Sequence, residues 1–169
     1  MGYTYKILTG TDVPLFKHLL RVFGEAFEEP DTYQSAVPGE AYLRDFLGKR
    51  HFIVLAALDG DTVVGGLVAY ELQKFEQERK ELYIYDLAVS AEHRRKGIAT
   101  NLIRELQQVA KERGVYLIFV QADPGDTPAI RLYESLGQRE DVHHFDIPVL
   151  GFVKKLVLTF SVVGSATGN

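Results

Sequence analysis

The sequence predicts an α/β protein in which a central mixed β-sheet is flanked by helices. Short apolar stretches of strand length alternate with longer stretches whose apolar residues recur at helical spacing. The earlier strands are joined by a tight turn or a short polar loop, which favours antiparallel neighbours. The strand expected at residues 115–120 is reached through a long helix, which favours a parallel neighbour. We therefore expect both kinds of strand pairing in one sheet.

The part of the chain before residue 50 predicts one strand and two helices. Residues 3–8 can form the strand, and Thr11 or Asp12 can cap the helix that follows. A loop is expected around Pro30, and a second, shorter helix at residues 40–47. The apolar residues at helical spacing in the first helix, all expected in the core, are Leu15, Leu19, Leu20, Phe23 and Phe27.

Three strands are predicted in the middle of the chain. Residues 52–58 and 63–72 are apolar and are joined by Asp59-Gly60-Asp61, a hairpin turn in which glycine accepts a positive φ. The pair Gly65-Gly66 lies inside the second strand and indicates a bulge or a close approach of other backbone. The third strand is expected at residues 81–89.

The remaining elements are two helices and two strands. A helix at residues 97–113, ended by Gly114, leads into a strand at residues 115–120 that is apolar enough to be covered on both faces. A short helix at residues 129–136 can be capped by Asp126 or Thr127, and residues 142–149 predict a final strand. Residues 1–150 are thus expected to form one domain, followed by a tail of unknown role at residues 151–169.

Composition narrows the function classes. The chain has no cysteine, which excludes disulfides, thiolate metal ligands and an acyl-cysteine intermediate. A net charge of −4 argues against a nucleic-acid partner and for a cationic one. There is no basic-then-apolar leader and no apolar run of about 18 residues, so we expect a cytoplasmic protein without a membrane partner. Adjacent His143 and His144 would point to opposite strand faces, so no metal site is expected.

The stretch from residue 83 to residue 100 carries the strongest functional signal. An apolar strand is followed by the basic turn Arg94-Arg95-Lys96 and by Gly97 at the start of a helix. The first backbone N–H groups of a helix have no intrahelical partner, and the helix dipole adds positive charge there, so this order suits a phosphate or pyrophosphate. The spacing fits neither a P-loop nor a dinucleotide fingerprint. The alternative interpretation is a solvated basic helix start.

Asp86 interrupts an otherwise apolar and aromatic strand. A carboxylate inside a sheet is unfavourable unless it is paired or faces a cavity. It can accept hydrogen bonds from loop amides, or it can face an amine substrate and help to remove its proton. We favour the second role because substrate sites are typically found where a strand ends beside a phosphate-binding site. Tyr83 and Tyr85 would lie on the opposite side of the strand unless a bulge intervenes.

Two segments resemble the GNAT N-acetyltransferase superfamily. Residues 94–99 fit Arg/Gln-x-x-Gly-x-Gly/Ala, with which its members bind the pyrophosphate of acetyl-CoA. Residues 129–137 resemble Ala-x-x-Leu-Tyr-x-x-x-Gly, in which the tyrosine hydroxyl lies near the thioester sulfur. The segments that also resemble bacterial GNAT-type aminoglycoside 3-N-acetyltransferases, including the gentamicin-acetylating ones, are residues 74–77, 83–90, 92–95, 97–100, 120–123 and 144–147.

The resemblance implies direct transfer of acetyl from acetyl-CoA to the 3-amino group of aminoglycosides such as gentamicin, hence antibiotic resistance, in a homodimer. Many members have Asn where this chain has Asp126, so this chain differs from the family pattern at a position that is expected to bind the cofactor. The cofactor-binding residues it implies are Leu87, Ala88, Val89, Arg94, Arg95, Lys96, Gly97, Ile98, Ala99, Thr100, Asp126 and Ala129. The substrate-binding residues it implies are Glu28, Asp31, Tyr33, Asp86, Asp123 and Asp146.

The mechanism expected from this resemblance uses two catalytic residues. Asp86 would take the proton from the amine, directly or through water, and Tyr133 would protonate the departing thiolate. A backbone N–H near Leu87 or Val89 would polarise the carbonyl. Without the resemblance, Tyr133 is simply an apolar-face helix residue. Alternatives for the whole protein are a polyamine or protein-amine acetyltransferase and a non-catalytic acyl-CoA-binding module.

Overall fold

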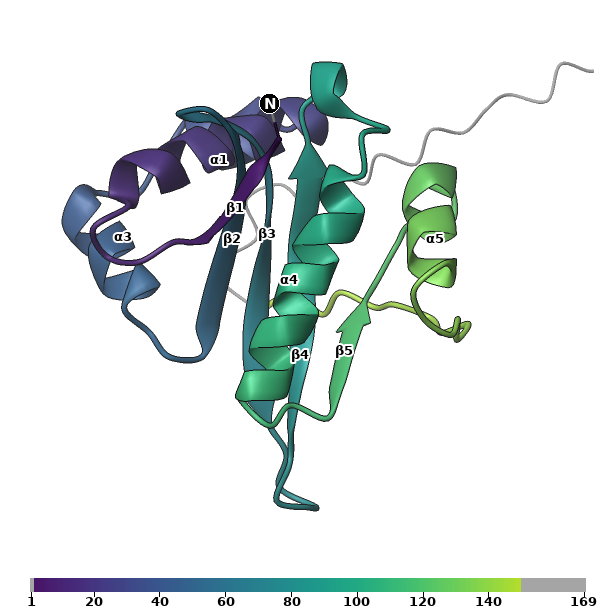
Figure 1. Ribbon diagram of the computed structural model, residues 1–169. Coiled ribbons are helices and arrows are strands. Elements are labelled where there is room, and N and C mark those ends of the chain that lie inside the picture. Colours follow the sequence, from purple (N-terminus) through teal and green to yellow (C-terminus); the bar gives the residue numbers. More distant parts are fainter. Residues whose placement is uncertain (1, 150–169) are drawn as a thin grey trace, which may run out of the picture.

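The computed structural model describes residues 2–149, and the predicted tail at residues 151–169 lies outside them. Its sheet has the strand order β1-β2-β3-β4-β5 (Figure 1). β1 to β4 pair antiparallel, and β5 pairs parallel to β4, so the predicted mixed sheet is confirmed. The strands are β1 (Thr4–Ile7), β2 (Phe52–Asp59), β3 (Thr62–Gln73), β4 (Lys80–Val89) and β5 (Leu117–Val120).

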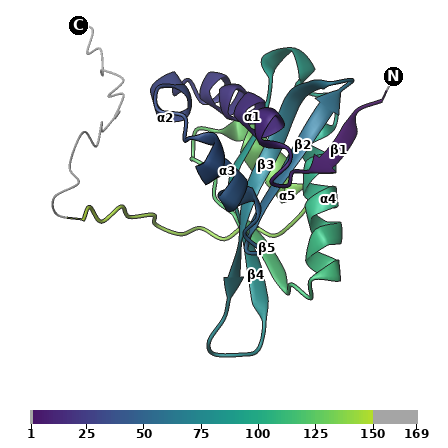
Figure 2. The ribbon, with the colours of Figure 1, turned by 90° about the vertical axis from the view of Figure 1, so that its left-hand side faces the viewer.

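Helices cover both faces of this sheet. α1 (Val13–Ala26), α2 (Pro30–Gln34) and α3 (Glu40–Leu47) lie on one face, and α4 (Ile98–Glu112) lies on the other (Figure 2). A short 3-10 helix, η1 (Ala91–His93), follows β4, and α5 (Thr127–Glu134) lies beyond β5. The parallel pair β4–β5 is thus connected through α4, as the long helix in the sequence predicts.

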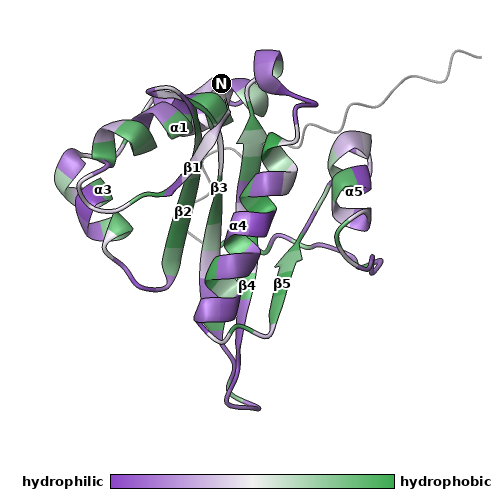
Figure 3. Ribbon diagram, in the orientation of Figure 1, coloured by the Kyte–Doolittle hydropathy of each residue, from purple (hydrophilic) through white to green (hydrophobic). Residues whose placement is uncertain are grey.

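The core consists of two apolar clusters, one on each face of the sheet. Side chains of successive strand residues point to opposite faces, so β2 contributes Val54 to the cluster under α1 and Leu55 to the cluster under α4. Leu19 and Phe23 of α1 are fully buried in the first cluster. The apolar side of α4 faces the sheet and its polar side faces outward (Figure 3). Burial on both faces explains why β2 is apolar at almost every position.

Two glycines have the roles that the sequence predicts, one in a turn and one at a close approach. Gly60 has a φ of 59° in the turn between β2 and β3, where a side chain would be strained. Gly66 lies under α1, where a Cβ would come within 2.6 Å of Leu19 Cδ1 and of the Leu55 carbonyl oxygen. The absence of a side chain at residue 66 therefore lets α1 pack directly on β3.

A bulge in β4 changes the direction of its side chains. Asp86 pairs with Val68 and Ile84 pairs with Ala69, so Tyr85 is an extra residue in β4. The ring centroid of Tyr85 lies 5.8 Å from that of Tyr70, which packs on the α1 side of the sheet. Because Asp86 contacts α2 on the same side, the bulge brings Tyr85 and Asp86 to one face.

Several predictions about local structure were wrong. Pro30 does not sit in a loop but begins α2, because its fixed φ and missing N–H suit the first turn of a helix. Asp12 lies at the N-cap position of α1 without capping it, since its carboxylate accepts hydrogen bonds from Thr9 and Lys6. Phe27, expected in the core, is 37% exposed just after the end of α1.

The two predictions beyond residue 114 also need correction. β5 spans only Leu117–Val120, and it is not covered on both faces, because Leu117 is 48% exposed. Residues 142–149 form no strand, and Phe145 and Ile147 are 78% and 88% exposed. An alternating apolar pattern becomes a strand only where a neighbour completes its hydrogen bonds. No described strand lies beyond β5 to do so.

Replacing Gly66 by alanine is expected to lower the free energy of unfolding by about 1–3 kcal/mol, because the added methyl group would overlap backbone as well as the Leu19 side chain. Urea unfolding followed by circular dichroism measures the change. Gly125→Ala is the matched control, since nothing lies within 4 Å of a Cβ at that position. Equal stability of the two variants would contradict the close packing of α1 on β3.

Candidate functional site

The site begins where β4 and β5 separate. Their parallel pairing runs from Glu81↔Leu117 to Ile84↔Val120 and then ends, while β4 continues to Val89. Within the described part of the chain, no strand pairs with residues 85–89 on the side that β5 has left. Backbone groups along this part of β4 can therefore bind an extended ligand. Leu87, Ala88 and Val89, predicted to bind the cofactor, form this open edge.

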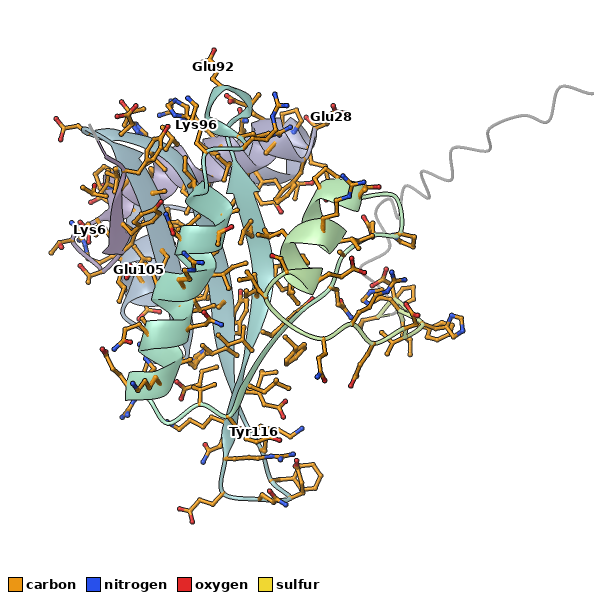
Figure 4. The ribbon with its side chains drawn as sticks, turned by 45° about the vertical axis from the view of Figure 1, so that its right-hand side comes forward. Lys6, Glu28, Glu92, Lys96, Glu105 and Tyr116 are labelled. Atoms are coloured by element: carbon orange, nitrogen blue, oxygen red, sulfur yellow. The ribbon has the colours of Figure 1, made fainter. Side chains whose placement is uncertain are left out.

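The basic loop lies at the end of this edge. The Nε of Arg94 donates a hydrogen bond to the Val89 carbonyl oxygen at 3.1 Å, which ties the loop to β4. Arg95 and Gly97 both have left-handed backbones, with φ of 60° and 79°, and α4 begins directly afterwards at Ile98. Arg94, Arg95 and Lys96 are all exposed. Figure 4 shows Lys96 at the end of the molecule where β4 meets α4.

This arrangement suits a phosphate-containing cofactor. The first backbone N–H groups of α4, at Ile98, Ala99 and Thr100, have no intrahelical acceptor. Nothing lies within 4 Å of a Cβ at Gly97, so its role is to provide the left-handed turn that opens the start of α4. Three cations, a helix N-terminus and an open strand edge fit a pyrophosphate joined to an extended chain.

Asp86 is half-buried beside the gap. The Tyr33 hydroxyl donates to both of its carboxylate oxygens at 3.2 Å, and Tyr33 belongs to α2 on the α1 side of the sheet. Burial raises the pKa of the Asp86 carboxyl above its usual value, the hydrogen bond from Tyr33 lowers it in part, and the negative charge of Glu29 raises it further. A carboxyl whose pKa is raised is a stronger proton acceptor once ionised.

Tyr133 packs on the α4 side of the sheet, opposite to the side on which Tyr33 lies. Asp126 caps α5 by accepting a hydrogen bond from the Ala129 N–H at 3.1 Å, as predicted for the helix start. Tyr133 is partly buried against the α4-side cluster that contains Val89 and Ile98. Burial, with the nearby charge of Asp126, raises the pKa of Tyr133 to about 12, so its hydroxyl is protonated at neutral pH. No hydrogen bond among the described residues joins Tyr133 to Asp86.

The structure joins only some of the predicted acceptor-side residues. Tyr33 and Asp86 are in contact, whereas Glu28, Asp31 and Asp123 are exposed and their side chains have no hydrogen-bond partner within residues 2–149. In the described part of the chain, the Asp146 carboxylate has one hydrogen-bond partner, His144, whose Nε2 lies 3.1 Å from its Oδ1. Residues 2–149 contain no group of three or more His, Asp or Glu side chains that could hold a metal ion.

Aromatic residues beside Asp86 were missed as part of the site. Tyr70 of β3 and Tyr83 of β4 each have a pKa raised first by burial and, in part, by the charge of Asp86. Tyr85 lies between them, with ring centroids 5.8 Å from each. The tyrosine-rich strand was visible in the sequence, but only the bulge shows that these rings and Asp86 share one face.

A sequence model described as the acetyltransferase (GNAT) family matches residues 15–138. The chain belongs to this family. The GNAT fold predicted from the sequence is confirmed, and acetyl-CoA is the cofactor of GNAT enzymes. The positive loop and open β4 edge described above fit that cofactor.

Solved structures of GNAT acetyltransferases resemble this one closely. An aminoglycoside acetyltransferase from an uncultured soil metagenomic sample is 54% identical, with a TM-score of 0.87 over 88% of this chain and 99% of that one. A second enzyme of that description and source, crystallised in complex with sisomicin, is 34% identical, with a TM-score of 0.81 over 87% of this chain and 96% of that one.

Curated relatives are more distant. A probable N-acetyltransferase family 8 member 5 from Mus musculus is 29% identical over 107 residues, which are 63% of this GNAT chain and 45% of the mouse protein. The chain thus spans less than half the length of that relative. The described residues include no helix long and apolar enough to cross a membrane.

Replacing Asp86 by asparagine is expected to leave the free energy of unfolding unchanged or to raise it at pH about 7.5. A carboxyl whose pKa is raised by folding is least favourable when ionised, so its removal relieves a destabilising charge. As the pH falls below the pKa of the folded state, Asp86 becomes neutral there and the difference declines, and it disappears below the unfolded pKa of about 3.9. Thermal unfolding over this pH range measures it. A wild type that is more stable than the variant at pH about 7.5, with the difference lost in acid, would contradict the raised pKa.

Proposed function

We propose that this GNAT protein acetylates the 3-amino group of aminoglycosides of the gentamicin type, with acetyl-CoA as donor, and so confers antibiotic resistance. The observation that carries the proposal is the half-buried Asp86 carboxylate beside the gap between β4 and β5, next to Tyr33 and near Glu29. The 54% identity to an aminoglycoside acetyltransferase supports an aminoglycoside acceptor. A homodimer and a cytoplasmic location stay predictions.

One group of cations and one group of carboxylates near the site support an anionic donor and a cationic acceptor, respectively. Arg94, Arg95 and Lys96 lie at the start of α4, while Glu28, Glu29 and Asp31 lie near the end of α1 and in α2. Figure 4 shows Glu28 and Lys96 at the same end of the molecule. Amines with a pKa of about 10 are mostly protonated at neutral pH, so a polyamine sugar is attracted to the carboxylates. The positive loop attracts phosphates instead.

The proposed chemistry assigns one task to each group. Bound acetyl-CoA supplies the acetyl thioester. The loop at residues 94–99 binds its pyrophosphate, and a backbone N–H near Leu87 or Val89 donates to the developing oxyanion. Asp86 accepts the ammonium proton, so that the free amine forms the new C–N bond as the C–S bond breaks. Tyr133 donates its hydroxyl proton to the departing sulfur, and the second proton that the nitrogen loses as the amide forms returns through water to the Tyr133 oxygen. We also retain Asp123, Asp126, Ala129 and Asp146 as candidate ligand contacts.

The decisive assay follows thiol release from acetyl-CoA with gentamicin, spermidine or a lysine peptide as acceptor. Gentamicin acetylated at its 3-amino group, identified by mass spectrometry and NMR, is the expected product. Asp86→Asn should lower kcat by a factor of about 100 to 10,000, and Tyr133→Phe should also lower kcat, because each removes a proton-transfer group. Asp45→Asn, an exposed carboxylate on α3, is the matched control with wild-type activity expected.

Each other outcome of this assay contradicts a different part of the proposal. Turnover of spermidine or peptide but not gentamicin would indicate a polyamine or protein-amine acetyltransferase. Binding of coenzyme A without turnover of any acceptor would indicate a binding module. Full activity of the Asp86→Asn variant on gentamicin would keep the substrate but remove Asp86 as the base.

Gly97→Ala should raise the KM for acetyl-CoA by about tenfold with a smaller change in kcat. An alanine at a φ of 79° is strained by about 1–2 kcal/mol, which favours a loop that no longer presents its N–H groups to phosphate. Gly39→Ala, at a φ of −61° with nothing within 4 Å of its Cβ, is the control. An unchanged KM in Gly97→Ala would show that the loop does not bind the cofactor in this conformation.

A further inference from the structure

Tyr33 makes an unusually symmetric contact with Asp86. Its hydroxyl lies 3.2 Å from Oδ1 and 3.2 Å from Oδ2, and the two residues are 53 positions apart in the chain. One O–H group shared between two oxygens holds the open end of the carboxylate toward the Tyr33 hydroxyl. The carboxylate retains lone pairs on its other sides, where an amine can approach. The contact with Tyr33 therefore orients the Asp86 carboxylate and leaves free the lone pairs that an amine would approach.

The ring of Tyr33 is held firmly from the α1 side. Its centroid lies 5.9 Å from that of Phe23 and 5.7 Å from that of Phe27, and its backbone N–H donates to the Glu29 carbonyl oxygen. α2 approaches α1 closely at Gly24, where a Cβ would lie 3.2 Å from the Tyr33 Cβ. The hydroxyl is thus placed by packing that is independent of any ligand.

Among the described residues, four tyrosines and one acid lie around Asp86. Tyr33 of α2, Tyr70 of β3 and Tyr83 of β4 are polar but neutral, and Tyr85 lies on the same face of β4. Glu29 is the acid whose negative charge affects the Asp86 carboxyl. Burial, together with the charge of Asp86, raises the pKa of Tyr33, so Tyr33 acts only as a neutral hydrogen-bond donor. Its hydrogen bond favours the ionised form of Asp86 against burial and Glu29.

We propose that Tyr33 is a positioning residue that orients the Asp86 carboxylate toward the acceptor amine and stabilises its charge through a hydrogen bond. This inference rests on the proposed role of Asp86 as the base. The resemblance in sequence implied a substrate-binding role for Tyr33. In this proposal Tyr33 does not bind the substrate but acts on the amine through Asp86.

Tyr33→Phe is expected to lower kcat/KM by about tenfold at neutral pH and to move the acidic limb of its pH profile to higher pH. The direction follows because loss of the hydrogen bond removes an interaction with the charged form, which raises the pKa of Asp86. Activity should recover partly at higher pH. Tyr116→Phe, an exposed tyrosine at the opposite end of the molecule (Figure 4), is the control and should show the wild-type profile.

A double-mutant comparison separates positioning from a merely structural effect. If Tyr33 acts through Asp86, adding Tyr33→Phe to Asp86→Asn should change the residual rate by a factor near 1. A further tenfold loss in that background, or an unmoved acidic limb in Tyr33→Phe, would overturn the proposal. Gly24→Ala provides a second variant if Tyr33→Phe folds poorly, because it displaces α2 while retaining the hydroxyl. It should shift the limb in the same direction.

The effect of Tyr33 on Asp86 can also be measured in a protein that does not turn over gentamicin. Carbon-13 NMR titration of the Asp86 carboxyl in free protein should give a higher pKa in Tyr33→Phe than in wild type. That shift, found in a protein inactive on gentamicin, would reject the substrate assignment and retain the Tyr33–Asp86 coupling. Gentamicin turnover with no such shift would retain the function and reject the coupling.

Discussion

The site depends on the separation of β4 from β5. Because the two strands stop pairing after Ile84 and Val120, the remaining part of β4 has a free edge inside the protein rather than at its margin. Backbone hydrogen-bonding groups left open in this way are unfavourable unless water or a ligand binds them. The bulge at Tyr85 lies at the same point and turns Asp86 toward α2. The open edge of β4 and the orientation of Asp86 thus occur at the same point of the strand.

The rest of the fold supports this irregular strand. β3 pairs with β4 from Gly65 to Gln73, and Gly65 and Gly66 let β4 and α1 approach β3 closely. Phe23 of α1 and Phe27 just after it pack against the Tyr33 ring, and α4 starts immediately after the basic loop. The two helices lie on opposite faces of the sheet, so Tyr33 and the start of α4 approach β4 from different sides.

Features set by neighbouring residues were predictable from the sequence. The turn at Gly60, the N-terminal cap at Asp126 and the loop before Ile98 each follow from a few adjacent positions, and each was predicted. The bulge at Tyr85 depends on register with β3, and the contact of Tyr33 with Asp86 depends on how α2 packs, so neither has a local signal. Residues 142–149 have a strand-like pattern but no described neighbour, which periodicity alone does not reveal.

The proposed role of Asp86 as the base can be tested by measuring the pKa of its carboxyl in the free wild-type protein. Carbon-13 labelling of aspartate, with assignment by the Asp86→Asn variant, allows its carboxyl to be titrated by NMR without any substrate. We expect a pKa above the ordinary aspartate value of about 3.9, because burial and Glu29 outweigh the hydrogen bond from Tyr33. A pKa at or below that value would show a carboxylate already satisfied by the protein, and would contradict its role as the base.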